Sequence, residues 1–152
     1  MINGINSREM ILEILLEIEE GEHSHVAIRN ALSKYQFLPK QDRAFITRVC
    51  EGTLEYRIQI DYIINSFSKV TVDKMKPAIR EILRSAVYQL KYMDSVPDSA
   101  VCNEAVKLAQ RKGFYNLKPF VNGVLRTIAR EMDQVRFPQK EDDLLKYLSV
   151  QY

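Results

Sequence analysis

Apolar residues recur every three or four positions along nearly all of this 152-residue sequence, and that periodicity most limits how the chain can fold. The spacing places apolar side chains on one face of an α-helix. No segment shows four or more strictly alternating apolar and polar positions bounded by turn residues, so the sequence predicts no β-strand. The length suits one domain with a sizeable core. We therefore predict an all-α fold, a single helical bundle of about seven helices.

Residues that begin or end helices divide the sequence into segments. We expect Ser7 to cap the first helix and Gly21 to follow its last turn. Proline suits the first turn of a helix because its ring already holds φ near the helical value. Prolines precede or open later expected helices at Pro39, Pro77, Pro97 and Pro138, the last of which leads into a short helix at 141–148.

Two segments predict how the helices pack. Residues 58–67 are apolar nearly all round, which predicts a helix at the centre of the bundle. The pair Asn122-Gly123 is typical of hairpin turns. Both residues nevertheless continue a helical stripe, so we expect Gly123 to lie within a helix and to allow the close approach of another helix.

Residues that would carry catalysis or hold a cofactor are few. The sequence has neither a G-x-G-x-x-G segment nor a G-x-x-x-x-G-K-[ST] segment, so we expect no nucleotide-phosphate loop. His23 and His25 lack the further ligands of a zinc site. Cys50 and Cys102 lie in apolar helical segments, which predicts reduced thiols in a cytoplasmic protein. No apolar run is long enough to cross a bilayer, so no membrane partner is expected. These features favour a binding or structural module without its own metal or cofactor.

Positive charge is concentrated in the middle of the chain. Residues 1–22 contain one Arg and six Glu, whereas residues 23–132 contain 18 Lys and Arg against 10 Asp and Glu. The row Glu9, Glu13, Glu17 and Glu20 is expected to form a solvated face. This distribution favours an anionic partner that contacts the middle of the chain.

One expected helix presents a candidate RNA-binding stripe opposite its apolar face, made of Arg80, Arg84, Tyr88 and Lys91. An aromatic ring among cations suits RNA, because the cations contact phosphates while the ring stacks on an unpaired base. Further cations extend the candidate surface: Lys74, Lys76, Arg111, Lys112, Lys118, Arg126 and Arg130. The alternative is an ordinary solvated surface with Tyr88 half-buried, since charged residues mostly lie on protein surfaces.

Four stretches of the sequence are similar to a known helical family. They are QDRAFITRVCEGTLEYRIQIDYII at 41–64, IREILRSAVYQLKYM at 79–93, VPDSAVCNEAVKLAQRKG at 96–113 and FVNGVLRTIARE at 120–131. In order and spacing they resemble the NusB-like domain, over residues 7–152. The resemblance implies an all-α fold and RNA binding. NusB-like domains occur as free transcription antitermination factors and as the N-terminal domain of RsmB (Sun/Fmu) methyltransferases, which use S-adenosylmethionine to make 5-methylcytosine in small-subunit ribosomal RNA.

Three features make the sequence more similar to the methyltransferase branch. The segment carrying Arg126 and Arg130 resembles its accessory domain, and the start offers Arg8 alone where free factors typically have several arginines. Residues 146–152, KYLSVQY, resemble the segment that leads into the catalytic part. The resemblance thus implies an RNA-binding domain at 1–135. It also implies that residues 136–152 begin the lead-in to a catalytic domain, so that the chain is a fragment of a longer protein.

The resemblance also implies partners, namely ribosomal RNA and the protein's own downstream methyltransferase domain. That domain is expected to hold S-adenosylmethionine and the catalytic cysteines, so we expect this chain to be non-catalytic. Two alternatives remain open: a free antitermination factor that binds RNA with a ribosomal protein, and a protein–protein adaptor.

Several positions match the pattern of the NusB-like domain. Asn103 and Asn122 lie at the edges of apolar stripes, where we expect hydrogen bonds between helices. The other matching positions are Asp42, Arg43, Gly52, Arg84, Tyr88, Gln89, Glu104 and Arg126.

Overall fold

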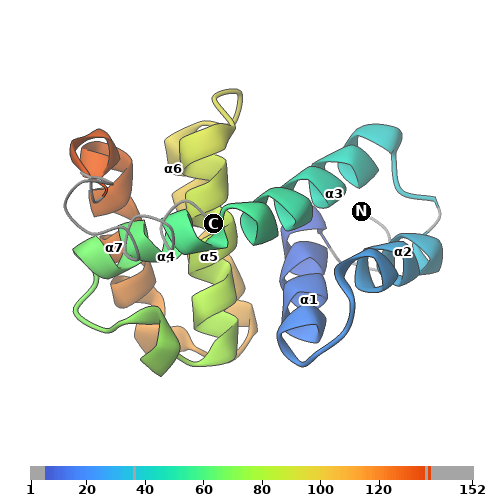
Figure 1. Ribbon diagram of the computed structural model, residues 1–152, viewed down its shortest axis with the longest axis horizontal. Coiled ribbons are helices and arrows are strands. Elements are labelled where there is room, and N and C mark those ends of the chain that lie inside the picture. The colour runs from blue at the N-terminus through green and yellow to red at the C-terminus, as the bar shows by residue number, and fades with distance from the viewer. Residues whose placement is uncertain (1–5, 36, 136, 138–152) are drawn as a thin grey trace.

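The computed structural model describes residues 6–35, 37–135 and 137, which form seven α-helices and three short 3-10 helices with no strand (Figure 1). This confirms the predicted all-α fold. The α-helices are α1 (Ser7–Glu19), α2 (Ser24–Lys34), α3 (Lys40–Glu55), α4 (Arg57–Phe67), α5 (Pro77–Tyr92), α6 (Asp98–Arg111) and α7 (Lys118–Glu131). The 3-10 helices are η2 (Val72–Lys74), η3 (Tyr115–Leu117) and η4 (Met132–Gln134). The helix predicted at 141–148 lies outside the described residues.

The ends of the helices mostly follow the expected signals. Gly21 has a φ of 117°, a left-handed conformation that suits the residue after a helix, so the prediction for Gly21 is confirmed. The prediction that Ser7 caps α1 is wrong by one residue. Asn6 is the cap, and its side-chain oxygen accepts a hydrogen bond from the backbone N–H of Glu9 at 2.8 Å. Pro39 likewise occupies the cap position of α3 rather than its first turn.

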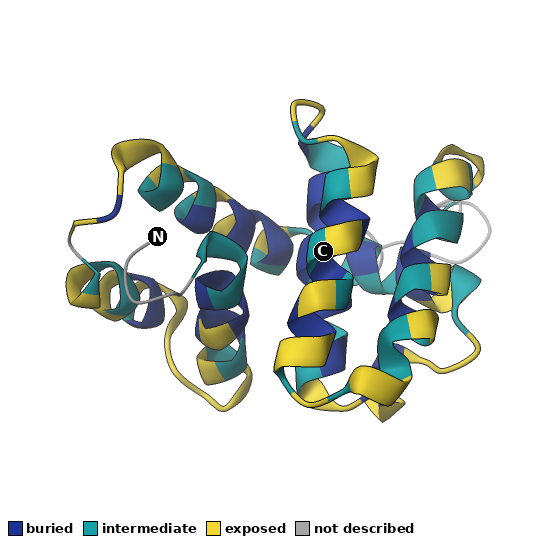
Figure 2. Cartoon of the chain, turned by 180° about the vertical axis from the view of Figure 1, so that it is seen from behind, coloured by how far each residue is buried: buried dark blue, intermediate teal, exposed yellow. Residues whose placement is uncertain are grey.

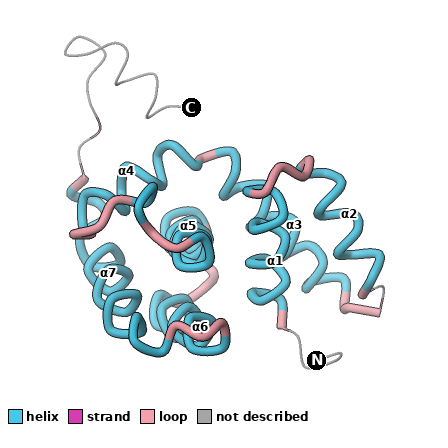
Figure 3. Tube along the Cα trace, turned by 90° about the horizontal axis from the view of Figure 1, so that it is seen from below, coloured by secondary structure: helices cyan, strands magenta, loops and turns pink. Residues whose placement is uncertain are grey.

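Helix α5 lies at the centre of the fold. It packs against α1, α3, α4, α6 and α7, and Figure 3 shows it end-on with neighbouring helices arranged around it. Its buried residues run almost without a break from Ile79 to Leu90. The prediction that 58–67 forms the central helix is therefore wrong. The wide apolar surface of α4 is shared between α5, α7 and the ring of Phe137, which contacts Tyr62.

The helices divide into two groups joined by α5. Helices α1, α2 and α3 pack together on one side, while α4, α6 and α7 surround α5 on the other (Figure 1). Buried residues lie on the helix faces that meet, and exposed residues lie on the outer faces (Figure 2). The core is continuous across both groups because α1 and α3 each contact α5 directly.

The close helix approach occurs at Gly52 and not at Gly123. Gly123 lies within α7 as predicted, but it is exposed, and a Cβ added there would meet no atom within 4 Å. The expected close approach at Gly123 is therefore wrong. A Cβ at Gly52 would instead collide with the ring of Tyr88. Gly52 thus lets α3 lie against the face of α5 that carries this tyrosine.

Candidate nucleic-acid interface

Arg80, the first residue of the predicted α5 stripe, is used inside the protein. Its Nη1 donates hydrogen bonds to the backbone carbonyl oxygens of Val72 and Met75, at 3.0 and 3.2 Å. Its Nη2 forms an ion pair with Glu19 of α1. The guanidinium therefore fastens the η2 turn and α1 to α5, and its donors are largely occupied.

Arg84 is the centre of a partly buried charge cluster. Its Nε and Nη2 donate to the two carboxylate oxygens of Asp61, each at 2.8 Å, and its Nη1 donates to Glu81 at 2.7 Å. Burial acts to lower the pKa of Arg84, but the hydrogen bonds and charges of Asp61 and Glu81 outweigh it and raise that pKa. Burial raises the pKa of Glu81 despite the attraction of Arg84. The cluster joins α4 to α5 and leaves only 11% of the Arg84 side chain exposed.

Tyr88 and Lys91 complete the stripe. The ring of Tyr88 is not available for stacking on a base, and the Lys91 ammonium lies against aromatic rings of the protein itself. Tyr88 is only 5% exposed and packs against Gly52 and Tyr92, so the expectation that the stripe lies opposite the apolar face is wrong at this position. The Lys91 ammonium lies 5.5 Å from the centre of the Tyr92 ring and 5.9 Å from that of Phe137. Periodicity placed the stripe on one face, but that face is covered by α3, α4 and the ring of Phe137.

The cations at the C-terminal end of α6 pair with carboxylates of α1. The Nζ of Lys112 lies 2.7 Å from a carboxylate oxygen of Glu13 and 3.5 Å from one of Glu9, and the hydrogen bond to Glu13 raises the pKa of Lys112. Arg111 is 3.9 Å from Glu9. Glu9 therefore belongs to an ion-pair cluster rather than to a freely solvated face.

The arginines of α7 also have partners within the protein. Arg126 donates to Asn122 at 3.1 Å and to Asn103 of α6 at 2.8 Å. The expected hydrogen bond between helices is confirmed for Asn103, whereas Asn122 accepts its hydrogen bond from Arg126 within α7, so the prediction is wrong for Asn122. Arg130 pairs with the adjacent Glu131 at 2.9 Å and remains mostly exposed.

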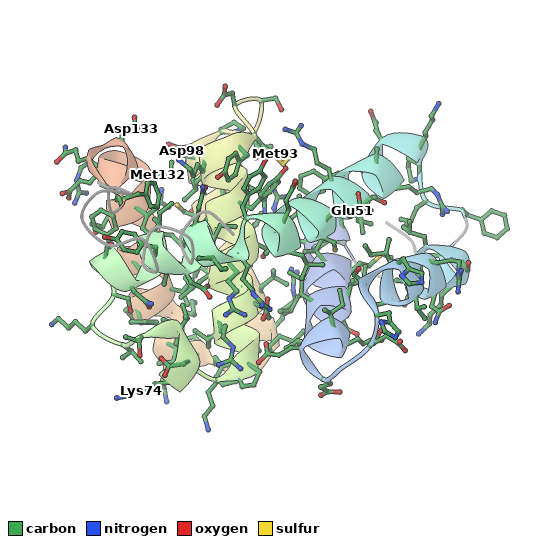
Figure 4. The ribbon with its side chains drawn as sticks, viewed as in Figure 1. Glu51, Lys74, Met93, Asp98, Met132 and Asp133 are labelled. Atoms are coloured by element: carbon green, nitrogen blue, oxygen red, sulfur yellow. The ribbon has the colours of Figure 1, made fainter. Side chains whose placement is uncertain are left out.

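Lys74 and Lys76 are the predicted cations that stay most available. Both are exposed, and among the described residues neither lysine side chain has a hydrogen bond or an ion pair. Lys74 stands at the edge of the molecule on the η2 turn (Figure 4). Asp73, also exposed, is an anion in the same turn. These lysines border a shallow groove of about 190 Å³.

The far wall of this groove comes from the start of α7. Leu117 and Phe120 face Lys74 and Lys76 across it. Beside this wall, the Nζ of Lys118 lies 4.5 Å from the ring centre of Tyr115 and donates to Gln110 at 2.7 Å. Tyr115 as a residue is 64% exposed. We call Lys74, Lys76, Tyr115 and Lys118 the η2–η3 surface.

Tyr115 was not predicted as a site residue, because the longest helical stripe offered Tyr88 as the candidate aromatic residue. The signal was present in GFYNLKPF at 113–120, where an aromatic follows a loop glycine and precedes a lysine. A residue after a helix-ending glycine is less constrained to face the core than one inside the stripe. Arg8 is also committed inside the protein: its Nε donates to Gln89 at 3.1 Å, and its guanidinium lies 5.2 Å from the Phe45 ring centre.

Potential ligands for metals and nucleophiles are dispersed over the part of the chain that the structure describes. No group of three His, Cys, Asp or Glu side chains is placed there to hold a metal ion. Cys50 and Cys102 are buried free thiols, and burial raises the pKa of each. None of the described helices is long and apolar enough to cross a membrane.

Fold and surface together define a helical domain built around a central helix, with an exposed cationic and aromatic surface at one end. The sequence pattern of the NusB family matches residues 5–130, so the chain belongs to the NusB family. It is 35% identical over 124 residues to a probable ribosomal RNA small subunit methyltransferase B of Bacillus subtilis. That match covers 82% of this chain and 28% of the Bacillus protein, so the chain spans under a third of that relative.

A second group of relatives consists of short proteins. The chain is 33% identical over 130 residues to a transcription antitermination protein NusB of Dictyoglomus thermophilum, covering 85% of each. Among solved structures, NusB of T. maritima aligns with a TM-score of 0.73 and 26% identity, covering 82% of this chain and 89% of that one. Antitermination factor NusB in a complex with NusE and double-stranded RNA aligns with a TM-score of 0.75 at 21% identity, covering 82% of this chain and 93% of that one. The structural likeness establishes the NusB fold.

Proposed function

We propose that this chain is the non-catalytic RNA-recognition domain of an S-adenosylmethionine-dependent ribosomal RNA cytosine-C5 methyltransferase of the cytoplasm. The observation that carries RNA recognition is the η2–η3 surface, where the exposed Lys74 and Lys76 border a groove and the exposed Tyr115, with Lys118 over its ring, lies on the segment that forms the other wall. Lysines attract phosphates, and an exposed ring supplies a stacking face for an unpaired base. A NusB relative solved with double-stranded RNA supports the choice of RNA as the partner.

Two relatives support the methyltransferase branch. The probable small subunit methyltransferases B of Bacillus subtilis and Synechocystis are 35% and 34% identical to this chain, which matches 28% and 29% of their lengths. The described residues contain no strand, and a strand followed by a glycine loop is what usually holds such a cofactor. We therefore assign the cofactor and the methyl transfer to another domain of the parent protein. The role of this chain is to bind and position ribosomal RNA beside that domain.

A free antitermination factor is the second candidate. It is favoured by NusB relatives of similar length, such as that of Dictyoglomus thermophilum, of which the chain covers 85%. In the solved complex NusB is accompanied by NusE, so this candidate would bind RNA together with a protein partner. Sequencing the gene on both sides of these codons distinguishes the two: a cofactor-binding domain in the same reading frame supports the methyltransferase.

Salt-dependent binding to a single-stranded ribosomal RNA fragment tests the RNA surface. The double change Lys74→Gln, Lys76→Gln should flatten the dependence of log K on log salt by about 1.4, or about 0.7 per lost phosphate contact. The matched control Lys107→Gln, Arg130→Gln removes two exposed cations that pair with Glu104 and Glu131, and it should leave the slope nearly unchanged. Tyr115→Ala should weaken binding by about 1–3 kcal/mol while Tyr115→Phe preserves it.

Equal effects of the two double changes would contradict the assignment of RNA to the η2–η3 surface. No saturable binding by the parent chain at low salt would favour the protein–protein adaptor instead.

A further inference from the structure

Two lysines of the η2–η3 surface lie on either side of a buried residue. Met75, between Lys74 and Lys76, is only 8% exposed and has an extended backbone, with φ of −79° and ψ of 156°. In an extended segment, the residues before and after a given residue point to the same side, opposite to it. The two lysines are therefore directed outward together, with their Cα atoms about 7 Å apart, as long as Met75 stays buried.

Arg80 holds this turn through backbone carbonyl groups. Its Nη1 donates to the carbonyl oxygens of Val72 and Met75, at 3.0 and 3.2 Å, and its backbone N–H donates to that of Lys76 at 2.9 Å. The ion pair between its Nη2 and Glu19 of α1 fixes the direction of the guanidinium. Only 15% of the Arg80 side chain is exposed, so the guanidinium faces the protein rather than a ligand in solution.

A second side chain holds the same turn from α4. The Oδ1 of Asn65 accepts a hydrogen bond from the backbone N–H of Val72 at 3.0 Å, and the Val72 side chain is itself buried. Helices α4 and α5 pack against each other, so Asn65 and Arg80 act from two helices that are held together. The backbone of the turn is therefore fixed on both its N–H and its carbonyl side before any ligand binds.

We propose that Arg80 is a positioning residue for RNA binding, which it supports by fixing the backbone that carries Lys74 and Lys76 and not by contacting phosphate. This inference rests on the proposed RNA-binding function of the η2–η3 surface. A turn that is ordered before RNA binds does not have to be ordered on binding, and ordering the backbone of one residue lowers affinity about five- to thirtyfold. Arg80 thus has a different role from the direct RNA contact that its place in the sequence predicts.

Binding of the whole 152-residue chain to a single-stranded ribosomal RNA fragment, measured at several salt concentrations, separates the two roles. Arg80→Met removes the donors but keeps a side chain of similar length. It should weaken binding about five- to thirtyfold and leave the dependence of log K on log salt unchanged, because no phosphate contact is lost. Arg80→Lys, whose ammonium can still donate to carbonyl groups, should retain more of the affinity. A slope flattened by about 0.7 in Arg80→Met would overturn the proposal, since it would reveal a direct phosphate contact.

Amide hydrogen exchange without RNA tests the positioning step by itself. The backbone N–H groups of Lys74 and Met75 donate to carbonyl oxygens within the turn, at 3.0 and 3.2 Å. In Arg80→Met, these two amides should exchange about five- to thirtyfold faster than in the parent, because the turn opens more often. The amide of Leu108, a buried residue of α6, should exchange at the parent rate.

Arg29→Met is the matched control, because it removes an exposed arginine from α2, and it should change neither the affinity nor the exchange rates. Three results for Arg80→Met would each overturn the positioning role and leave the RNA assignment intact: an unchanged affinity, an unchanged exchange rate in the turn, or equally faster exchange at Leu108. An affinity that does not respond to the double change Lys74→Gln, Lys76→Gln would instead overturn the proposed function, and the positioning role with it.

Discussion

Replacing Gly52 by alanine should destabilise the protein, although alanine favours a helix more than glycine does. The added methyl group would collide with the ring of Tyr88, which is held by its contact with Tyr92 and by burial in the core. Overpacking of this kind costs about 1–3 kcal/mol. The gain in helix propensity offsets about 1 kcal/mol of that cost. We therefore expect a net loss of about 1 kcal/mol, or about 2–4 °C in Tm for a chain of this size.

Gly123→Ala is the matched control, because Gly123 also lies inside a helix but has open space around its Cα. It should raise the free energy of unfolding by about 1 kcal/mol. The gain in propensity is common to both variants, so the difference between them, about 1–3 kcal/mol, measures the collision with Tyr88 alone. Urea unfolding followed by circular dichroism gives both values.

Combining the alanine with Tyr88→Leu tests the cause. If the ring is the obstacle, Gly52→Ala should no longer destabilise a protein that already carries Tyr88→Leu, a coupling that a double-mutant cycle reports directly. The reasoning is refuted if Gly52→Ala and Gly123→Ala have the same stability, since the ring would then move aside without cost.

Further predictions concern the buried charges and thiols. Because the folded-state pKa of Glu81 is raised, the native protein binds more protons than the unfolded chain, and stability falls as pH rises from the ordinary glutamate pKa through the raised one. The glutamine of Glu81→Gln does not titrate. Chemical denaturation across that pH window should therefore show the free energy of unfolding of the variant increasing relative to that of the parent as pH rises. A difference in unfolding free energy that does not change with pH would contradict this. Arg84→Met should cost about 3–5 kcal/mol because it leaves Glu81 buried without its cation, and adding Glu81→Gln should recover part of that loss in the same assay. Cys50 and Cys102 should react with iodoacetamide only as fast as the protein unfolds, and mass spectrometry of alkylation under native conditions against denaturing conditions checks this.

Local periodicity was enough to predict the helices, because each depends on which residues lie three or four positions apart. It was not enough to predict which helix is central. Residues 58–67 have apolar side chains on nearly every side, yet part of that surface meets Phe137, a residue 70 positions beyond the end of α4. The face of α5 that looked polar is covered instead. Arg84 there meets Asp61 across 23 residues of chain.

The candidate site shows the same limit. Spacing correctly put Arg80 and Arg84 on one side of α5. Their partners, Glu19 and Asp61, come from other helices, and local sequence spacing cannot predict such ion pairs. Lys74 and Lys76 could be recognised as candidates because a short turn leaves few ways to bury them. The exposure of Tyr115 could not be predicted in the same way, because it depends on how the segment after α6 packs, with Leu117 and Phe120 against the groove beside that turn.

The central helix, α5, also fixes the distance between two surface features of the protein. Its first residue, Pro77, follows directly after Lys76, and its last turn holds Lys91 against Phe137. Sixteen residues of helix separate these two ends by about 24 Å, and five other helices pack against α5. The lysines before one end of α5 and the Phe137 ring at the other end are therefore held at a fixed separation. A flexible linker would let the distance between these two points vary, whereas a buried helix keeps that distance constant.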